Sequence, residues 1–172
     1  KSSDLPVEAV KVESSSSAAS AEHGDEPAEQ EDFRANFLVS QILTSIPAGM
    51  RDRKFQSVLD FGCAEGAITG VLGSQLGVPP ERLFGADVRA IPNPGFKFIQ
   101  LPSDDSGSDE VVEESKSLLP SIPSKSIDVI NVAMVLHHVT NLKSSLAELL
   151  RVIADDGVLL LREHHCANSY FG

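Results

Sequence analysis

Short apolar runs alternate with longer segments of helical spacing from residue 33 onwards. The apolar runs predict β-strands at residues 57–61, 82–88, 96–101, 127–134 and 157–163. The helical spacing predicts helices at residues 33–45, 67–77 and 142–153, and an acidic helix or loop near residues 108–119. Strands that alternate with helices indicate an α/β fold, a parallel sheet with helices on both faces. Right-handed crossovers then give the strand order 3-2-1-4-5, with ligands at the carboxyl ends of the strands.

The first predicted helix carries several apolar residues. We expect Phe33, Phe37, Leu38 and Ile42 to fall broadly on one side of that helix. That side should cover the sheet near its ligand-binding edge.

A glycine turn joins the first predicted strand to the next helix. The stretch from Val58 to Gly66 reads Val-Leu-Asp-Phe-Gly-Cys-Ala-Glu-Gly. Gly62 and Gly66 let the backbone turn tightly and approach a ligand, which the amides at the start of the helix would face. Ordinary strand-to-helix turns also use glycine, so this turn indicates a nucleotide-sized cofactor only together with other features.

The second predicted strand ends in an acidic residue. Asp87 lies 27 residues after Asp60, near the end of an apolar run. A carboxylate at the carboxyl end of a strand can accept hydrogen bonds from both hydroxyl groups of a ribose, which suits an adenosine cofactor. The alternative is a solvent-exposed aspartate without a ligand.

These segments resemble the class I S-adenosylmethionine-dependent methyltransferases between about residues 55 and 163. In that family the first strand ends in an acidic residue and a loop of the form acid-x-Gly-x-Gly-x-Gly. Here the loop runs from Asp60 to Gly66, with Ala64 in place of the middle glycine. Residues 126–139 resemble the fourth strand and its loop, and residues 149–161 resemble the next helix, turn and strand. Asp155-Asp156-Gly157 stands where many members have Pro-Gly-Gly.

The resemblance implies a Rossmann-like domain at residues 33–172 with S-adenosyl-L-methionine as cofactor. The cofactor-binding positions that it implies are Asp60, Gly62, Ala64, Gly66, Asp87 and Ala133. Asp87 would bind the ribose, and the loop would surround the methionine part. A dinucleotide site of the dehydrogenase type fits less well, because Gly-x-Gly-x-x-Gly is absent.

The ends of the chain suggest a segment of a longer protein. The family normally adds a helix and two strands after the fifth strand, whereas this chain ends at Gly172 and begins without methionine. We therefore expect the C-terminal strands of the sheet to belong to a remaining part of a longer chain.

Four of the five histidines form two adjacent pairs, His137-His138 and His164-His165, after predicted strands four and five. Both pairs would lie at the edge where a methyl acceptor enters. A neutral imidazole could remove a proton from a hydroxyl or an amine, or could bind a divalent metal ion together with Glu163. Adjacent residues in a strand point to opposite faces, so at most one histidine of each pair should face the site. His137 and His138 are the catalytic candidates, of which at most one should act. The alternative is that both are polar residues at the end of a strand.

A metal site is not expected. Glu163, His164 and Cys166 lie close together in the sequence, but no ligand-spacing motif supports a zinc ion there. Cys63 is expected to be a small buried residue, and the two cysteines of the chain give no disulfide framework.

Residues 1–32 differ from the rest of the chain. They contain a run of four serines, two lysines and nine acidic residues, which gives a net charge of −7 against −11 for the whole chain. Such a segment buries too little apolar surface to offset the entropy of ordering, so we expect a disordered acidic tail or linker.

Charge and hydropathy limit the partners. Residues 33–172 carry 12 basic and 16 acidic groups, and only Arg51, Arg53 and Lys54 cluster, as solvated charges before a strand. Nucleic-acid binding is therefore not supported, although RNA stays open as an acceptor if another segment or partner supplies the surface.

No apolar run could span a bilayer and the start lacks a signal-peptide core, which predicts a cytoplasmic protein without membrane contact.

The leading hypothesis is an enzyme that transfers a methyl group from S-adenosylmethionine to an unidentified acceptor. Such an enzyme mainly holds donor and acceptor together and excludes water. No Asn-Pro-Pro-Tyr-type motif supports methylation of base or glutamine nitrogens by that route. The alternatives are a catalytically inactive cofactor-binding or regulatory module of a larger protein, and a nucleotide-sugar or NAD-binding domain.

Overall fold

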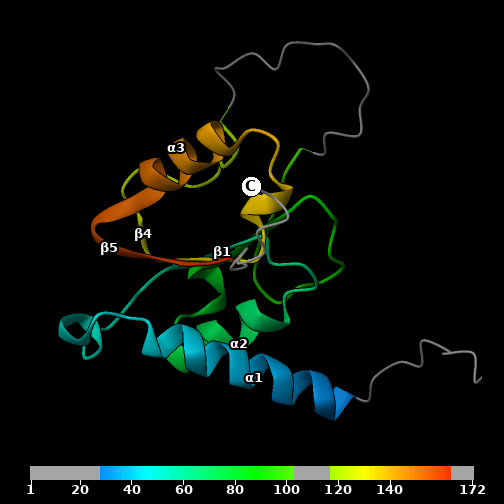
Figure 1. Ribbon diagram of the computed structural model, residues 1–172, viewed down its shortest axis with the longest axis vertical. Helices are drawn as coiled ribbons and strands as arrows, with labels where there is room; N and C mark the ends of the chain where they lie inside the picture. The colour runs from blue at the N-terminus through cyan, green and yellow to red at the C-terminus, as the bar shows by residue number, and fades with distance from the viewer. Residues whose placement is uncertain (1–27, 103–116, 164–172) are drawn as a thin grey trace, which may run out of the picture.

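A computed structural model describes residues 28–102 and 117–163 of the chain. A five-stranded parallel sheet in the order β3-β2-β1-β4-β5 forms its centre (Figure 1). The strands are β1 (Val58–Phe61), β2 (Leu83–Asp87), β3 (Lys97–Gln100), β4 (Ile127–Ala133) and β5 (Ile153–Arg162). The predicted fold class and strand order are confirmed.

Three α-helices cover the two faces of this sheet. Helices α1 (Ala28–Thr44) and α2 (Ala67–Leu76) lie on one face, and α3 (Leu142–Val152) lies on the other (Figure 1). Three short 3-10 helices complete the described part, η1 (Ala48–Met50), η2 (Pro80–Arg82) and η3 (Leu136–His138). None of the helices in the described ranges is both long and apolar enough to cross a membrane.

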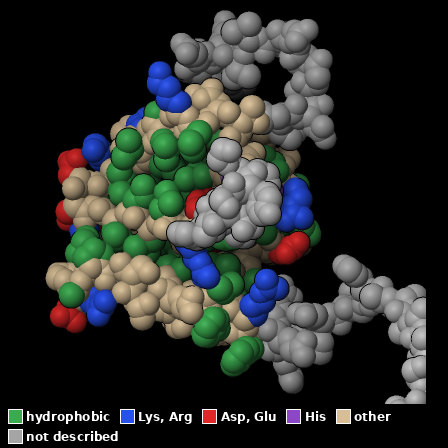
Figure 2. Space-filling model, in the orientation of Figure 1, with side chains coloured by type: hydrophobic (Ala, Val, Ile, Leu, Met, Phe, Trp, Pro, Cys, Tyr) green, Lys and Arg blue, Asp and Glu red, His purple; other side chains and the backbone are tan. Residues whose placement is uncertain are grey.

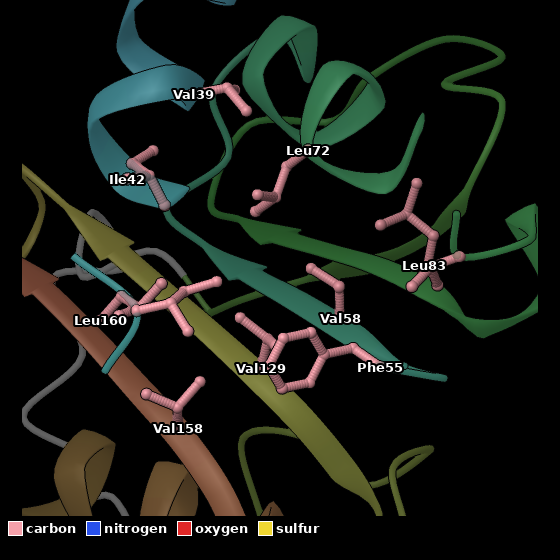
Figure 3. Close-up of a cluster of buried hydrophobic side chains, with 11 residues drawn as sticks. Val39, Ile42, Phe55, Val58, Leu72, Leu83, Val129, Val158 and Leu160 are labelled. Carbon is pink, nitrogen blue, oxygen red and sulfur yellow. The ribbon is translucent and has the colours of Figure 1, made fainter. Parts of the chain in front are cut away.

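Buried apolar side chains pack on both faces of the sheet. On the face of α1 and α2, Val39 and Leu72 from these helices meet Val58 and Val129 of the central strands (Figure 3). A second buried cluster lies under α3 and includes Leu149. The central strands are buried on both faces, which explains their nearly continuous apolar sequence.

The buried side of α1 is not the predicted one. Phe33 and Phe37 are 76% and 53% exposed, whereas Ala35, Val39 and Ile42 are buried. The prediction placed Phe33 and Ile42 on one face, but nine residues of a helix amount to about two and a half turns, which puts them on opposite sides. The helix also begins at Ala28, five residues before the predicted start, so residues 28–32 of the predicted disordered tail belong to α1.

The start of β5 also differs from the prediction. We expected a turn at Asp155-Asp156-Gly157 and a strand from residue 157, but β5 follows α3 directly at Ile153. Ile127 pairs with Ile153 and Val129 pairs with Val158, so β5 has extra residues between these two pairs. The predicted turn is therefore a bulge within the strand.

The edge of the sheet at β5 carries apolar side chains. Leu161 is 51% exposed on β5, and Leu150 is 61% exposed on α3. Figure 2 shows apolar side chains gathered on this face, between α3 and α1.

Two predictions lie wholly or mostly outside the described residues. They concern the acidic tail, up to residue 27, and the acidic segment near residues 108–119, of which only residues 117–119 are described.

Candidate cofactor and catalytic site

The loop between β1 and α2 lies at the carboxyl edge of the sheet. Gly62 and Gly66 have φ angles of 82° and 84°, in the left-handed region that favours glycine. A β-carbon at Gly66 would lie 2.6 Å from Cζ of Phe96, and one at Gly62 would collide with Val135. Both glycines are thus required by the packing of the protein itself. Ala64, in place of the family's middle glycine, also has a left-handed backbone, with φ 48°.

Asp60 is buried beneath this loop, and each oxygen of its carboxylate accepts one hydrogen bond. Thr69 Oγ1 on α2 donates a hydrogen bond to Oδ2 at 2.6 Å, and Asn131 Nδ2 on β4 donates one to Oδ1 at 2.8 Å. Burial raises the pKa of Asp60, and the two hydrogen bonds act against that rise. The side chain joins β1, α2 and β4 below the loop.

Asp87 at the end of β2 holds the same loop from the side. Its Oδ2 accepts a hydrogen bond from the Ala64 N–H at 2.8 Å, and its Oδ1 accepts one from the Arg89 N–H at 3.0 Å. An ionised carboxylate has about four acceptor positions. Those two hydrogen bonds are the only ones of Asp87 in the described part of the chain, and Nε of Arg89 lies 4.0 Å from Oδ1. Each oxygen therefore keeps acceptor capacity, and the side chain of Asp87 is 12% exposed at the edge of the sheet, where a ligand can reach it.

Backbone contacts fix the loop against β2. The N–H groups of Gly62 and Cys63 both donate to the Ala86 carbonyl oxygen, at 2.7 and 3.2 Å. Cys63 is buried as expected, and burial raises the pKa of its thiol to about 12. A thiol with that pKa stays protonated near neutral pH and is a poor nucleophile.

The catalytic candidates lie on the 3-10 helix that follows β4. The ring centroids of His137 and His138 are 3.9 Å apart. The expectation that adjacent histidines point to opposite faces is wrong for this pair, because it assumed a strand and η3 brings both rings to one side. Ala133 is the last residue of β4 and pairs with Arg162 of β5, so it lies at the same edge.

Glu163 organises the start of η3. Its Oε2 lies 2.8 Å from Nδ1 of His137, and its Oε1 accepts hydrogen bonds from the N–H groups of Val135 and Leu136, at 3.0 and 2.7 Å. Partial burial raises the pKa of Glu163, but the hydrogen bonds from His137 and the two amides outweigh it and lower the pKa overall.

Sequence reasoning considered Glu163 only as a metal ligand and missed this contact. The sequence offered one indication of this contact: Glu163 directly follows β5, and His137 follows β4, the neighbouring strand. The other members of the considered zinc set, His164 and Cys166, lie outside the described residues, as does His165. Within the described ranges, no group of three or more His, Cys, Asp or Glu residues is arranged to hold a metal ion.

Comparisons with known proteins give the family and the fold of the chain. A family model described as a methyltransferase domain matches residues 31–170. A structure of a SAM-dependent methyltransferase from Archaeoglobus fulgidus matches with a TM-score of 0.50 and 18% identity, over 77% of this chain and 55% of that one. A structure of the complex between the Haloferax volcanii Trm112 methyltransferase activator and a methyltransferase matches with a TM-score of 0.51 and 15% identity, over 76% and 53%. No match was found among curated protein sequences.

The sheet order and the family model together define a Rossmann-like methyltransferase domain. The chain belongs to the class I S-adenosylmethionine-dependent methyltransferase family. It spans about half the length of the two solved chains that it matches.

Proposed function

We propose that this domain binds S-adenosylmethionine at the carboxyl edge of its sheet and transfers the methyl group to an acceptor. The observation that carries the proposal is the hydrogen bond between Asp87 and the Ala64 amide, which joins the glycine loop to the acidic end of β2. This contact brings the glycine loop next to the Asp87 carboxylate, which can accept further hydrogen bonds. In a chain of the methyltransferase family, such a pair supports a cofactor site.

The residues fit this cofactor. Asp87 would accept hydrogen bonds from the ribose hydroxyls, and the loop from Gly62 to Gly66, with Ala133 beyond it, would enclose the methionine part. Asp60 acts from below, because its side chain is buried under the loop and holds Thr69 and Asn131. The bound cofactor supplies an electrophilic methyl carbon on its sulfonium, and the protein positions the acceptor and excludes water.

A base is needed only for an acceptor that begins protonated. When His137 donates its Nδ1–H to Glu163, the basic lone pair of the neutral ring lies on Nε2. His137, oriented by Glu163, is therefore the proposed proton acceptor, with His138 beside it.

Titration calorimetry tests the cofactor. We expect S-adenosylmethionine and S-adenosylhomocysteine to bind, and NAD not to bind. Asp87→Ala should weaken binding by about 1.5–3 kcal/mol, as for a hydrogen bond to a charged group. Asp52→Ala, which removes an exposed carboxylate before β1, is the matched control and should change nothing. Equal binding by Asp87→Ala and the parent would remove Asp87 from the site, and binding of NAD alone would favour a dinucleotide-binding domain.

The second candidate is a cofactor-binding module without catalysis. It is favoured by one observation, that in the described residues the contacts of Asp60 and Asp87 concern the cofactor loop and none identifies an acceptor. Methyl-labelled S-adenosylmethionine, incubated with the protein and a cell extract, separates the two. Label transfer by the parent but not by Asp87→Ala supports methyl transfer, and cofactor binding without label transfer supports the module.

A further inference from the structure

A cavity of about 360 Å³ lies at the amino-terminal ends of the strands, opposite to the candidate cofactor site. Its lining comes from the residues just before β1, β2 and β4 and from the start of β5. These four strands are adjacent and parallel, so their amino-terminal ends meet at one edge of the sheet. The charged residues of the lining are Arg53, Lys54, Arg82, Lys125 and Asp128.

The acidic residue of this lining is already neutralised. Oδ1 of Asp128 lies 3.2 Å from the Arg53 guanidinium, and Oδ2 accepts a hydrogen bond from the Gln56 N–H at 2.6 Å. Arg53 also contacts the Asp156 carboxylate at 3.0 Å. Arg53 and Asp128 therefore build the wall of the cavity and contribute little net charge to it.

Three other cations give the cavity its charge. Lys125 pairs with Asp155 at 2.9 Å, but both side chains are more than half exposed, and such surface pairs are weak. The side chains of Lys54 and Arg82 make no ion pair or hydrogen bond within the described residues. Lys54 and Arg82 precede the neighbouring strands β1 and β2, so two unpaired cations face one cavity in a chain whose net charge is −11.

We propose that this cavity binds a small anion that carries two linked phosphate groups. Apart from Ala154, its lining is polar or charged, which suits an anion rather than an apolar ligand. A guanidinium can bind a phosphate through two parallel hydrogen bonds, and an ammonium adds a point charge beside it. Arg82 and Lys54 supply one of each. The site is separate from the proposed cofactor site, which lies at the other edge of the sheet.

A competing explanation is that these cations stabilise helix ends. Helices α2 and α3 each connect two parallel strands, so their carboxyl-terminal ends lie at this same edge. Cations there interact favourably with the helix dipole, with or without an anion. That explanation predicts an effect of Lys54 and Arg82 on thermal stability and none on anion binding.

The experiment is a calorimetric titration of the full chain with pyrophosphate at low ionic strength. We expect the parent to bind pyrophosphate more tightly than inorganic phosphate. The double variant Lys54→Gln/Arg82→Gln should bind pyrophosphate about tenfold more weakly, which corresponds to about 1.4 kcal/mol. The control Arg34→Gln/Lys143→Gln makes the same change in net charge on α1 and α3, outside the cavity lining, and should bind like the parent.

Three results would overturn the proposal. The first is a parent that does not bind pyrophosphate or binds it no better than inorganic phosphate. The second is equal weakening in both double variants, which would reflect net charge alone. The third is a lower melting temperature of Lys54→Gln/Arg82→Gln with unchanged pyrophosphate affinity. That result is expected if the two cations only stabilise the carboxyl-terminal ends of the helices. Unchanged S-adenosylmethionine affinity in the presence of pyrophosphate would support two separate sites.

Discussion

Asp60 and Asp87 lie near the carboxyl ends of adjacent parallel strands, but the structure gives their carboxylates different surroundings. Asp60 is buried and accepts hydrogen bonds on both oxygens from Thr69 and Asn131. Asp87 accepts from two backbone amides and keeps acceptor capacity at the edge of the sheet. One acid therefore supports the loop from below, and the other is available to a ligand.

We expect Asp60→Ala to destabilise the fold. Loss of the carboxyl group leaves the Thr69 hydroxyl and the Asn131 amide without their acceptor in a buried position. An unsatisfied buried polar group costs about 1–3 kcal/mol. Urea denaturation should show a lower midpoint for Asp60→Ala and an unchanged one for Asp52→Ala. An unchanged midpoint for Asp60→Ala would mean that the buried contacts contribute nothing to stability.

The chemistry-bearing positions could be predicted from the sequence, but their partners could not. Asp60, Gly62 and Asp87 follow from motif and strand order. The contact of Asp60 with Asn131 joins residues far apart in the chain, and it depends on the register of β1 against β4. The contact of Glu163 with His137 likewise requires β4 and β5 to be neighbours and η3 to follow β4. The predicted strand order made β1, β4 and β5 neighbours, but the register between them and the 3-10 helix after β4 could not be predicted from local patterns.

At the scale of the element, the sequence correctly predicted the strands that are buried on both faces. It did not predict which side of helix α1 is buried. The central strands β1 and β4 are buried on both faces, so their apolar runs identify them directly. Helix α1 has apolar residues on more than one side, and spacing must decide which side is buried. Ala35, Val39 and Ile42 follow each other at intervals of four and three residues, which keeps them in one narrow stripe.

The two sides of α1 should respond differently to truncation of a side chain. Ile42→Ala removes a buried side chain that packs against the sheet, and should cost about 2–5 kcal/mol. Phe37→Ala removes a larger side chain that is mostly exposed, and should change stability by less than about 1 kcal/mol. Chemical denaturation of the two variants measures both values. A larger loss for Phe37→Ala would restore the predicted orientation of the helix.

The last turn of α3 makes stability depend on pH. Hydrogen bonds from Arg151 lower the pKa of Glu148 to about 2, against a smaller opposing effect of burial. Arg151 also donates to the carbonyl oxygens of Leu119 and Ile122, so the pair fixes the segment before β4. A carboxyl group with a lowered pKa in the folded state stabilises the fold above its ordinary value of 4.5, and that contribution is lost as pH falls towards 2.

We therefore expect the parent to lose more stability than Glu148→Gln when pH falls from 4.5 to 2. Glu148→Gln should be less stable than the parent near neutral pH, and the difference should shrink as the solution becomes acidic. Melting temperatures measured by circular dichroism across this range test the prediction. Parallel melting curves for the two proteins at every pH would exclude Glu148 as a source of the pH dependence.

At the scale of the whole molecule, the two edges of the sheet have different chemistry. The carboxyl edge combines the glycine loop, Asp87 and the pair of His137 with Glu163. The amino edge carries the cavity lined by Lys54 and Arg82. The parallel arrangement of the strands produces this separation, because every strand contributes its end to one edge and its start to the other.

The amino-terminal region should divide sharply into a dispensable part and an essential part. The composition of residues 1–27 gives them little apolar surface to bury, whereas Val39 and Ile42 of α1 are part of the core beneath β1 and β4. A protein that begins at Ala28 should therefore melt at the same temperature as the full chain and bind S-adenosylmethionine equally well. A protein that begins after Ile46 loses all of α1 and exposes the apolar face of the sheet, so it should be strongly destabilised or fail to fold. Differential scanning calorimetry of the two truncated proteins measures this difference. A fall of several degrees on removal of residues 1–27 alone would show that the acidic tail is docked on the domain and would contradict its prediction as a disordered segment.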